Sequence, residues 1–472
     1  MKAQKLTFGI ASLVLCGTAF AQEKDPRLNP PVQPVGVEST SKAPNTTAPP
    51  PVQEKTIEKE PLSGARWLGL GSLGGGRSYL QPSFSFSQGG DMDVKGPNVT
   101  RAQSQVNAGV MLRREWQRYL IDLDYSIGGV VYSTQQNKAA LVQGLGLSQT
   151  ISLRRWTFTV SDHFSYLPES GYGAPLLGNV GNGAFGGGGI GGGIINGNPL
   201  YNPAQTIITN NGNRISNSAT GQVQYDFSRH LSFTGSAGYG ILRFLDNGTG
   251  LLESNTLTAQ GGVNYAFNRF DNVAVTYSLQ QTSFKGVSGG LDSHTVQLSY
   301  ARRITGRMVL QFGAGPQYRD FNIPGQIPNN RFSWTATSRV LYAMRDMDLA
   351  FAYSRFSTNG SGVLLGASTD NVDLTANRKI GRNWSGTIGG GLALNRSLAQ
   401  SLAGTNPSKF RTWHTNASFG RRVGRSMNLS LTYNYQEQVQ TVCAVSVVCF
   451  PDTQRHVFGL MFGWRPQPIE LN

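Results

Sequence analysis

The stretch "RRVGRSMNLSLTYNYQEQ", residues 421–438, decides the fold. Large apolar side chains occupy the odd positions from Met427 to Tyr435, and Asn, Ser, Thr and Gln occupy the even positions from Asn428 to Gln436. Successive side chains of a β-strand point to opposite faces, so this pattern predicts a strand with one apolar and one polar face. A soluble sandwich would bury the apolar face, whereas a transmembrane barrel would turn it toward lipid and keep the polar face in water.

The same alternation recurs along most of the chain and predicts eighteen strands. Each is about as long as the 9 to 11 tilted residues that cross a bilayer, or a little longer. The predicted strands are residues 77–88, 103–113, 118–132, 139–153, 156–167, 214–227, 231–243, 254–267, 272–284, 292–303, 307–320, 331–343, 347–357, 369–379, 383–395, 409–421, 426–437 and 454–465. We therefore predict an all-β, antiparallel, up-and-down transmembrane barrel of about eighteen strands, with sixteen as the alternative count.

The connections favour the barrel over the sandwich. Short basic turns such as "RREWQR" (113–118) and "RRVGRS" (421–426) follow the even-numbered strands, whereas longer Gly- and Asn-rich links such as "LDNGTGLLES" (245–254) follow most odd-numbered ones. The two ends of a sandwich are equivalent, but an outer-membrane barrel has short periplasmic turns and long external loops. An even number of strands returns both ends of the barrel to the periplasm.

Aromatic residues gather at the short-turn ends of the predicted strands. Amphipathic rings are favoured at the headgroup level of a membrane, so we expect these residues to form the periplasmic aromatic girdle. They are Trp116, Tyr119, Trp156, Tyr225, Phe227, Tyr265, Phe267, Tyr300, Tyr342, Trp384, Phe419 and Trp464.

The first residues, "MKAQKLTFGIASLVLCGTAFAQEK", have the features of a signal peptide. Lys2 and Lys5 precede an apolar run, and Ala19-Phe20-Ala21 has the small-x-small pattern of a cleavage site. We expect a signal peptide at 1–21 and a Pro-rich, disordered periplasmic linker at 22–65. The barrel is then expected at 66–466 and a short C-terminal tail at 467–472.

The formal net charge of +15 bears on the choice of partners. Export argues against nucleic acid and leaves membrane lipid or a solute. We expect contact with outer-membrane lipids and lipopolysaccharide, and passage of small hydrophilic solutes. The linker serves either as a spacer or as a docking segment for a periplasmic partner.

Two cysteines follow the expected signal peptide, and both lie in "QTVCAVSVVCFPDTQ". Cys443 and Cys449 have no histidine or further cysteine beside them, which argues against a metal site. An exported protein lies in an oxidising compartment, so we predict a disulfide between them. We expect no cofactor and no metal.

The chain resembles bacterial outer-membrane β-barrels of the porin type, including barrels associated with exopolysaccharides. The resemblance is carried by strands such as "VNAGVMLR" (106–113), "WTFTVSDHFSY" (156–166) and "WSGTIGGGLALN" (384–395), together with the basic short turns. It implies a location in the bacterial outer membrane. Such barrels commonly end on an aromatic residue, whereas here "RPQPIELN" follows Trp464.

The inward parity of the strands predicts a water-filled channel with a hydroxyl and amide lining. The expected lining residues are Thr256, Thr258, Gln260, Asn264, Thr276, Ser278, Gln280, Arg319, Arg339, Asn428, Ser430, Thr432 and Asn434. Charges of inward parity are few, namely Asp122, Asp124, Asp226, Arg319, Arg339 and Asp373. We therefore expect a non-enzymatic pore for small hydrophilic, uncharged solutes.

Two alternative functions stay open. One is an outer-membrane component of an exopolysaccharide export system, with the Pro-rich linker holding a periplasmic partner. The other is a barrel hydrolase, because His294 and His456 have outward parity near external strand ends, where lipid-hydrolysing barrels carry a Ser and His pair. Neither histidine has a recognisable catalytic motif around it.

The Gly-rich connection 168–213 is the third external link of the predicted barrel. A connection of this length within a compact fold is usually functional or disordered. The sequence leaves open whether it folds into the pore or lies outside.

Overall fold

The computed structural model describes residues 78–94, 100–133, 138–167, 207, 213–245, 251–268, 270–305, 307–324, 326–328, 331–401, 408–442 and 452–471. The expected signal peptide and linker, both cysteines and most of the Gly-rich connection lie outside these residues.

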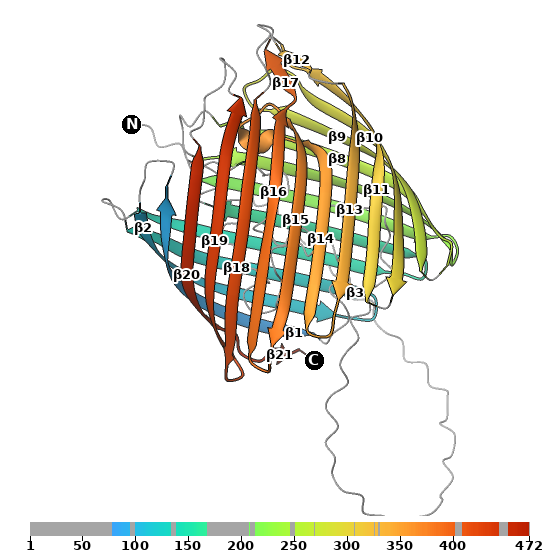
Figure 1. Cartoon of the computed structure of the whole chain (residues 1–472). Coiled ribbons are helices and arrows are strands. Elements are labelled where there is room, and N and C mark those ends of the chain that lie inside the picture. Colours follow the sequence, from blue (N-terminus) through green and yellow to red (C-terminus); the bar gives the residue numbers. More distant parts are fainter. Residues whose placement is uncertain are drawn as a thin grey trace, which may run out of the picture. The chain divides into compact units, whose positions relative to one another are not determined.

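Eighteen long antiparallel strands form the wall of a closed barrel (Figure 1). They are β1 (Tyr79–Asp93), β2 (Thr100–Glu115), β3 (Tyr119–Ser133), β4 (Lys138–Ser152), β5 (Trp156–Leu167), β6 (Arg214–Asp226), β7 (Leu231–Phe244), β8 (Ser254–Ala266), β9 (Asp271–Phe284), β10 (Gly290–Thr305), β11 (Met308–Asn322), β13 (Phe332–Ala343), β14 (Met347–Thr358), β15 (Ala367–Ile380), β16 (Trp384–Ser397), β18 (Lys409–Val423), β19 (Met427–Val442) and β20 (Thr453–Trp464). Each pairs with the next along the chain, and β20 pairs with β1 to close the ring. The predicted all-β barrel and its count of eighteen are confirmed.

Three short strands and one short helix complete the secondary structure of the described residues. β12 (Gln326–Pro328) and β17 (Ala399–Ser401) pair with each other, and β21 (Ile469–Glu470) pairs with β1. The 3-10 helix η3 (Gly360–Gly362) lies between β14 and β15. No helix in the described part of the chain is both long and apolar enough to cross a membrane.

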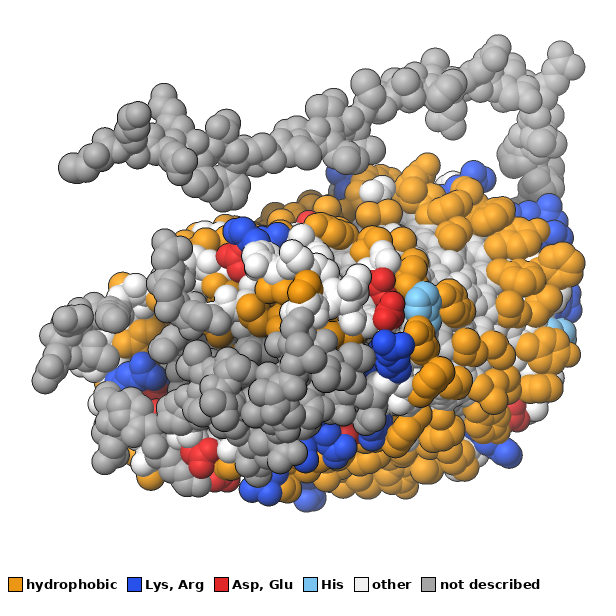
Figure 2. Space-filling model, turned by 90° about the horizontal axis from the view of Figure 1, so that it is seen from above, with side chains coloured by type: hydrophobic (Ala, Val, Ile, Leu, Met, Phe, Trp, Pro, Cys, Tyr) orange, Lys and Arg blue, Asp and Glu red, His pale blue; other side chains and the backbone are white. Residues whose placement is uncertain are grey.

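The two faces of the wall differ as the alternation predicts. Leu431 on β19 is 58% exposed, whereas the adjacent Thr432 is 4% exposed and donates its hydroxyl hydrogen bond to the Gly459 carbonyl. Hydrophobic side chains cover much of the outer flank (Figure 2). A wall with an apolar outside and a polar inside suits lipid on one face and water on the other.

The two ends of the barrel differ in their connections. At one end, called here the short-turn end, consecutive strands are joined by tight turns. Gly424, in the turn between β18 and β19, has a φ of 67°, which glycine adopts without the clash of a Cβ atom. At the other end, the long-connection end, the link between β14 and β15 and the strands β12 and β17 are found (Figure 1).

The C-terminal tail continues the wall beyond the last long strand. β20 pairs with β1 up to Phe84 opposite Trp464, and β21 then pairs with the start of β1, where Tyr79 faces Glu470. Gln81 Nε2 also donates to the Pro466 carbonyl at 2.8 Å. The residues after Trp464 therefore cover the first part of β1, which β20 does not reach.

Candidate functional site: the lumen and an inward hairpin

The β14–β15 hairpin leaves the barrel wall near its tip. Pairing between β13 and β14 ends at Ala336 opposite Arg355. From there through Thr369 the alternation between buried and exposed residues is lost, since every residue of 356–369 is buried except the half-buried Leu365. Burial of both faces means that this segment, called here the inward hairpin, lies inside the barrel.

Hydrogen bonds hold the hairpin tip against strands on another part of the wall. Asn359 Nδ2 donates to Ser254 Oγ at 3.0 Å, although the two residues are 105 positions apart. The Leu252 backbone N–H donates to the Gly362 carbonyl at 2.7 Å. The tip is therefore anchored at the beginning of β8, several strands away from its own strands around the ring.

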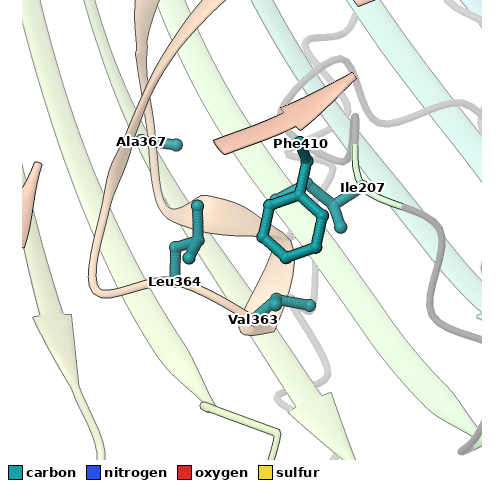
Figure 3. Packing of buried hydrophobic residues seen from close by; sticks show 5 residues of the cluster. All are labelled: Ile207, Val363, Leu364, Ala367 and Phe410. Carbon is teal, nitrogen blue, oxygen red and sulfur yellow. The ribbon is translucent and has the colours of Figure 1, made fainter. Parts of the chain in front are cut away.

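One apolar cluster packs beneath the hairpin tip, with side chains that converge on one another (Figure 3). Its buried members are Ile207, Val363, Leu364, Ala367 and Phe410. Ile207 is 2% exposed and Phe410 1% exposed, so both are shielded from the water of the lumen. The cluster joins the hairpin to β18 and to one residue of the connection 168–213.

A second apolar cluster lies beside the first. Its buried members are Phe284, Leu291, Phe321, Ile323 and Leu398, with Leu252, Val287, Leu365 and Ala399 packed against it. The Leu398 backbone N–H donates to the Gly366 carbonyl at 3.1 Å, which ties this cluster to the hairpin. Burial of these two apolar clusters inside an otherwise polar barrel supplies the hydrophobic stabilisation that keeps the hairpin in place.

A polar network holds the base of the hairpin. Gln317 on β11 donates from Nε2 to Ser293 Oγ at 2.7 Å and accepts at Oε1 from the Ser357 hydroxyl at 3.0 Å. Arg319 donates from Nε to the same Gln317 oxygen at 3.0 Å, and from Nη2 to Ser368 Oγ at 3.4 Å. Both strands of the hairpin are thus bound to the inner face of β11.

The hairpin tip requires an unusual backbone. Gly360, Gly362 and Gly366 have φ values of 75°, 80° and 81°, and Ser361 has a φ of 56°. A Cβ atom on Gly362 would lie 2.5 Å from the Phe244 ring. Glycine is therefore needed at 362 for both its conformation and its lack of a side chain, whereas Ser361 bears the cost of a left-handed residue with a side chain.

The structure places the predicted lining residues on the inner face of the wall, with different exposures. Thr256, Thr258, Gln260, Ser278, Gln280, Arg339 and Asn428 are half-buried, whereas Asn264, Thr276, Arg319, Ser430, Thr432 and Asn434 are buried. Several bond to one another or to inner neighbours, as Thr256 and Thr282 do at 3.4 Å between their hydroxyl oxygens. Their contact with a solute stays a prediction.

The inner wall carries more charges than the six predicted from the inward parity of the strands. Asp91 accepts from Arg455 at 2.7 and 2.6 Å and lies 3.1 Å from Arg101, while Arg113 lies 3.7 Å from Asp122. The expectation of few inward charges was wrong because it omitted Asp91, Arg101, Arg113 and Arg455, which lie toward the strand ends. Opposite charges at these distances compensate each other in part, with three arginines against two aspartates.

A buried contact between a histidine and a carboxylate spans three strands of the inner wall. His414 Nε2 on β18 lies 3.2 Å from Asp373 Oδ1 on β15, and Asn371 donates to the other carboxylate oxygen of Asp373. β16 runs between them and carries Gly391, where a Cβ atom would lie 2.4 Å from His414 Cε1 and 2.6 Å from Asp373 Oδ1. The glycine therefore makes room for the two side chains, and His414 is an inner residue that was not among the predicted lining residues.

The predicted girdle residues lie at the short-turn end. All are exposed on the outer face except the half-buried Tyr225 and Tyr300. Some form ring contacts, as Trp384 and Phe419 do with centroids 4.7 Å apart. Their role at a membrane interface stays a prediction.

A second group of aromatic residues lies at the long-connection end and was not predicted from the sequence. It includes Tyr318, Phe332 and Trp334.

The two histidines of the hydrolase hypothesis are partnered by tyrosine. The Tyr277 hydroxyl lies 2.8 Å from His294 Nδ1, and the Tyr433 hydroxyl lies 3.0 Å from His456 Nδ1. The hydrolase hypothesis instead requires a serine hydroxyl beside the histidine ring. Within the described residues, no group of three or more His, Cys, Asp or Glu side chains is placed to hold a metal ion.

Comparison with known proteins gives a family match for part of the barrel. Residues 204–304 match the family model described as "Putative beta-barrel porin 2". No curated protein matches the chain in sequence. The matched segment includes β6 to β9 and nearly all of β10, which form a continuous part of the wall.

Several solved structures resemble the barrel at low sequence identity. OccK1 (OpdK) of Pseudomonas aeruginosa is 9% identical with a TM-score of 0.41, over 82% of this chain and 99% of that chain. OpdQ of Pseudomonas aeruginosa is 9% identical with a TM-score of 0.43, over 83% and 99%. OccAB4 of Acinetobacter baumannii is 7% identical with a TM-score of 0.42, over 83% and 99%. These likenesses concern the fold and say nothing of a solute.

The closed wall of eighteen strands, with an apolar outer face and a polar inner face, has the architecture of a transmembrane β-barrel, and residues 204–304 of that wall match a porin family model.

Proposed function

We propose that the barrel is an outer-membrane pore for small hydrophilic, uncharged solutes, and that the inward hairpin forms its narrow part. The observation that carries this proposal is the burial of both faces of residues 356–369 inside the barrel. Porins pass solutes through a water-filled interior, and their selectivity follows from pore width and from the hydrogen-bonding groups that line it. A segment that crosses the interior therefore sets the width.

The lining supports an uncharged solute. Hydroxyl and amide groups on β8 and β9 are half-buried and so accessible from the lumen, as for Thr258, Gln260 and Gln280. Such groups both donate and accept hydrogen bonds and can replace part of the hydration shell of a sugar. The Asp91 carboxylate lies against the Arg455 guanidinium, so part of the inward charge is compensated within the wall.

Removal of the hairpin tip tests the role of residues 356–369. Thr358 pairs directly with Ala367 at the end of the β14–β15 ladder, so an Asn-Gly turn can replace Asn359–Gly366 between them. We expect the variant to keep its barrel, to conduct more in planar bilayers and to admit larger sugars in liposome swelling.

The turn at the opposite end of the barrel provides a matched control. Replacing residues 424–426 by Asn-Gly between Val423 and Met427 shortens the chain without touching the inward hairpin. This variant should conduct as the unmodified protein does. Unchanged conductance after removal of the hairpin tip would contradict the proposed constriction.

Ion selectivity tests the uncharged lining separately. In a salt gradient, a lining without net field should give a reversal potential near zero. A strong preference for anions or cations would contradict the proposal of uncharged solutes and leave the constriction itself unaffected.

The N-terminal segments are part of the proposal. We assign residues 1–21 to a signal peptide, 22–65 to a periplasmic linker, 66–466 to the barrel and 467–472 to a short tail, with the short turns facing the periplasm. Deletion of 22–64 should leave the conductance of a simple pore unchanged. Loss of a co-purifying envelope protein upon that deletion would instead favour the export component.

A further inference from the structure

One buried arginine of the inner wall lacks a partner. Arg214, the first residue of β6, is 6% exposed. Its Nε atom is enclosed by the protein and has no hydrogen-bond partner. Within the described residues, its guanidinium group forms no ion pair with a carboxylate and no contact with an aromatic ring. Burial of a charge is unfavourable unless another group compensates it, so this guanidinium group is suited to an external counter-ion.

The strand register places Arg214 beside the tip of the inward hairpin. Arg214 pairs directly with Phe244 on β7, and directly opposed residues of antiparallel strands share a face, with Cβ atoms about 4.5–5.5 Å apart. The Phe244 ring packs against the tip, because a Cβ atom on Gly362 would lie 2.5 Å from it. Arg214 therefore faces the interior of the barrel next to the segment that narrows it.

Other arginines of the inner wall are held by neighbouring side chains. Arg455 donates two hydrogen bonds to the Asp91 carboxylate, at 2.7 and 2.6 Å. Arg319, which binds the base of the hairpin, donates from Nε to Gln317 Oε1 at 3.0 Å. The wall thus supplies acceptors where an arginine has a structural role, and the described residues supply none to Arg214.

The charges around Phe244 are positive in sum. Glu253 accepts a hydrogen bond from the Phe244 backbone N–H at 3.4 Å. Its carboxylate lies 2.8 Å from Lys285 Nζ and 3.8 Å from Arg243 Nε, so two cations already share it. With Arg214, three positive charges stand against one negative charge among these groups. The local field therefore attracts an anion.

The surroundings of the guanidinium group strengthen a contact with an anion. Phe244 lies opposite Arg214 and Leu242 lies diagonally to it, and these apolar side chains are 9% and 1% exposed. Charge-assisted hydrogen bonds gain strength where water is excluded. Of the guanidinium nitrogens, only Nε is fully enclosed without a partner, which leaves the two Nη atoms to meet a ligand from the lumen.

We propose that Arg214 binds the oxyanion group of a small ligand, a carboxylate or a phosphate, in the lumen beside the hairpin tip. The planar guanidinium group can donate two parallel N–H···O bonds to the oxygens of either group. The bound anion would compensate the buried charge and occupy space next to the narrow part of the pore. This inference goes beyond the proposed pore function, since it concerns a bound ligand and does not depend on the solute that passes.

The test uses the full-length, refolded protein in detergent and two variants of the site, Arg214→Gln and Arg214→Lys. The control is Arg229→Gln, which removes the same charge from an exposed residue in the short turn between β6 and β7. The measurement is the melting temperature from tryptophan fluorescence. It is recorded against the concentration of sodium acetate or of sodium phosphate, with sodium chloride keeping the ionic strength constant.

We expect one or both oxyanions to raise the melting temperature of the unmodified protein and of the control at the same concentrations. Arg214→Gln should need at least about tenfold more anion for the same shift, because charge-assisted hydrogen bonds are lost. Arg214→Lys should respond between the two, because an ammonium group keeps the charge without the planar pair of donors. The more effective of acetate and phosphate at equal concentration distinguishes a carboxylate ligand from a phosphate ligand.

The same experiment without oxyanion tests whether the charge is uncompensated. In sodium chloride alone, Arg214→Gln should melt at the same temperature as the unmodified protein or higher, because a buried charge without a partner is removed. A lower melting temperature, or failure of this variant to fold, would show that Arg214 has a structural partner and would overturn the proposal.

Two further outcomes would overturn the proposal. One is an equal response of the unmodified protein and Arg214→Gln to both oxyanions, and the other is no response of the unmodified protein to either. Liposome swelling in uncharged sugars tests the pore without any oxyanion. Failure at Arg214 therefore leaves the pore proposal standing, and failure of the pore proposal leaves the binding measurement valid.

Discussion

The Ile207 backbone N–H donates a hydrogen bond to Ser361 Oγ at 3.3 Å, although the two residues are 154 positions apart. Ile207 belongs to the connection 168–213, whose location the sequence leaves open. Its buried side chain lies in the same apolar cluster as Val363 of the inward hairpin and Phe410 of β18. Two connections of the barrel thus share one site inside the lumen.

Substitution of Ser361 tests this contact. Ser361→Ala removes the acceptor for Ile207 and keeps the left-handed backbone, which costs about 1–2 kcal/mol for a residue with a side chain. Ser361→Gly removes both the acceptor and that cost. A buried neutral hydrogen bond contributes about 0.5–1.5 kcal/mol, so we expect Ala to lower the unfolding free energy by about that amount and Gly to lower it less. Urea titration of the refolded protein measures the effect, and equal stability of the two variants would contradict it.

Gly391→Ala should disturb the buried pair of Asp373 and His414. The new Cβ atom would lie within 2.6 Å of both side chains, so one must move. We expect a loss of about 1–3 kcal/mol in unfolding free energy, as for other overpacked sites. Gly261→Ala is the control, because a Cβ atom there would meet nothing within 4 Å. Urea titration of refolded protein compares the two, and equal stability would argue against the crowded site.

Leu298→Arg and Ser299→Arg test the two faces of β10. Leu298 is 57% exposed on the outer wall, and a cation there meets the apolar interior of the membrane at a cost of about 2–4 kcal/mol near the midplane. Ser299 is half-buried on the inner face, where water solvates the guanidinium. Unfolding free energies in lipid vesicles should therefore differ between these adjacent variants. Equal destabilisation by the two substitutions would contradict the assignment of the faces.

Truncation after Trp464 should weaken the barrel without preventing its closure. The truncated chain keeps the β20–β1 ladder, which begins at Trp464, and loses the hydrogen bonds of Gln81 to Pro466 and of the Leu471 N–H to Ser78. Each such bond contributes about 0.5–1.5 kcal/mol net, so we expect a loss of about 1–3 kcal/mol. The heat-modifiable shift of the gel band shows whether the truncated barrel folds, and the temperature at which the shift is lost gives its unfolding midpoint. Complete failure to fold would show that the tail is needed for assembly itself.

The wall of the barrel was predictable because each strand carries its own signal. Where one face meets lipid and the other meets water, alternation such as that from Met427 to Tyr435 is strong, and a one-residue shift would expose the wrong face. The inward hairpin gave no comparable signal. Residues 356–369 are buried on both faces, and "NGSGVLLG" (359–366) reads as an ordinary turn.

The hydrogen-bond partners of the inner polar groups also could not be predicted from the sequence. Asn359 meets Ser254, and Ser361 meets Ile207, only because the barrel closes and the hairpin bends into it. A weaker signal existed for His414. A run of three glycines within a strand, ending at Gly391, often marks a close approach by neighbouring groups, and here His414 and Asp373 approach it.

The pairing of Tyr79 with Glu470 brings the first and last residues of the wall side by side at one rim. A chain with neighbouring ends can be joined there and opened elsewhere without changing which strands are adjacent. Linking residue 471 to residue 78 and cutting at the turn around Gly424 would give a circular permutant that starts at β19 and finishes at β18. Such a molecule would retain every strand pair of the ring but begin its synthesis at a different point of the wall, and so would separate the order of translation from the order of closure.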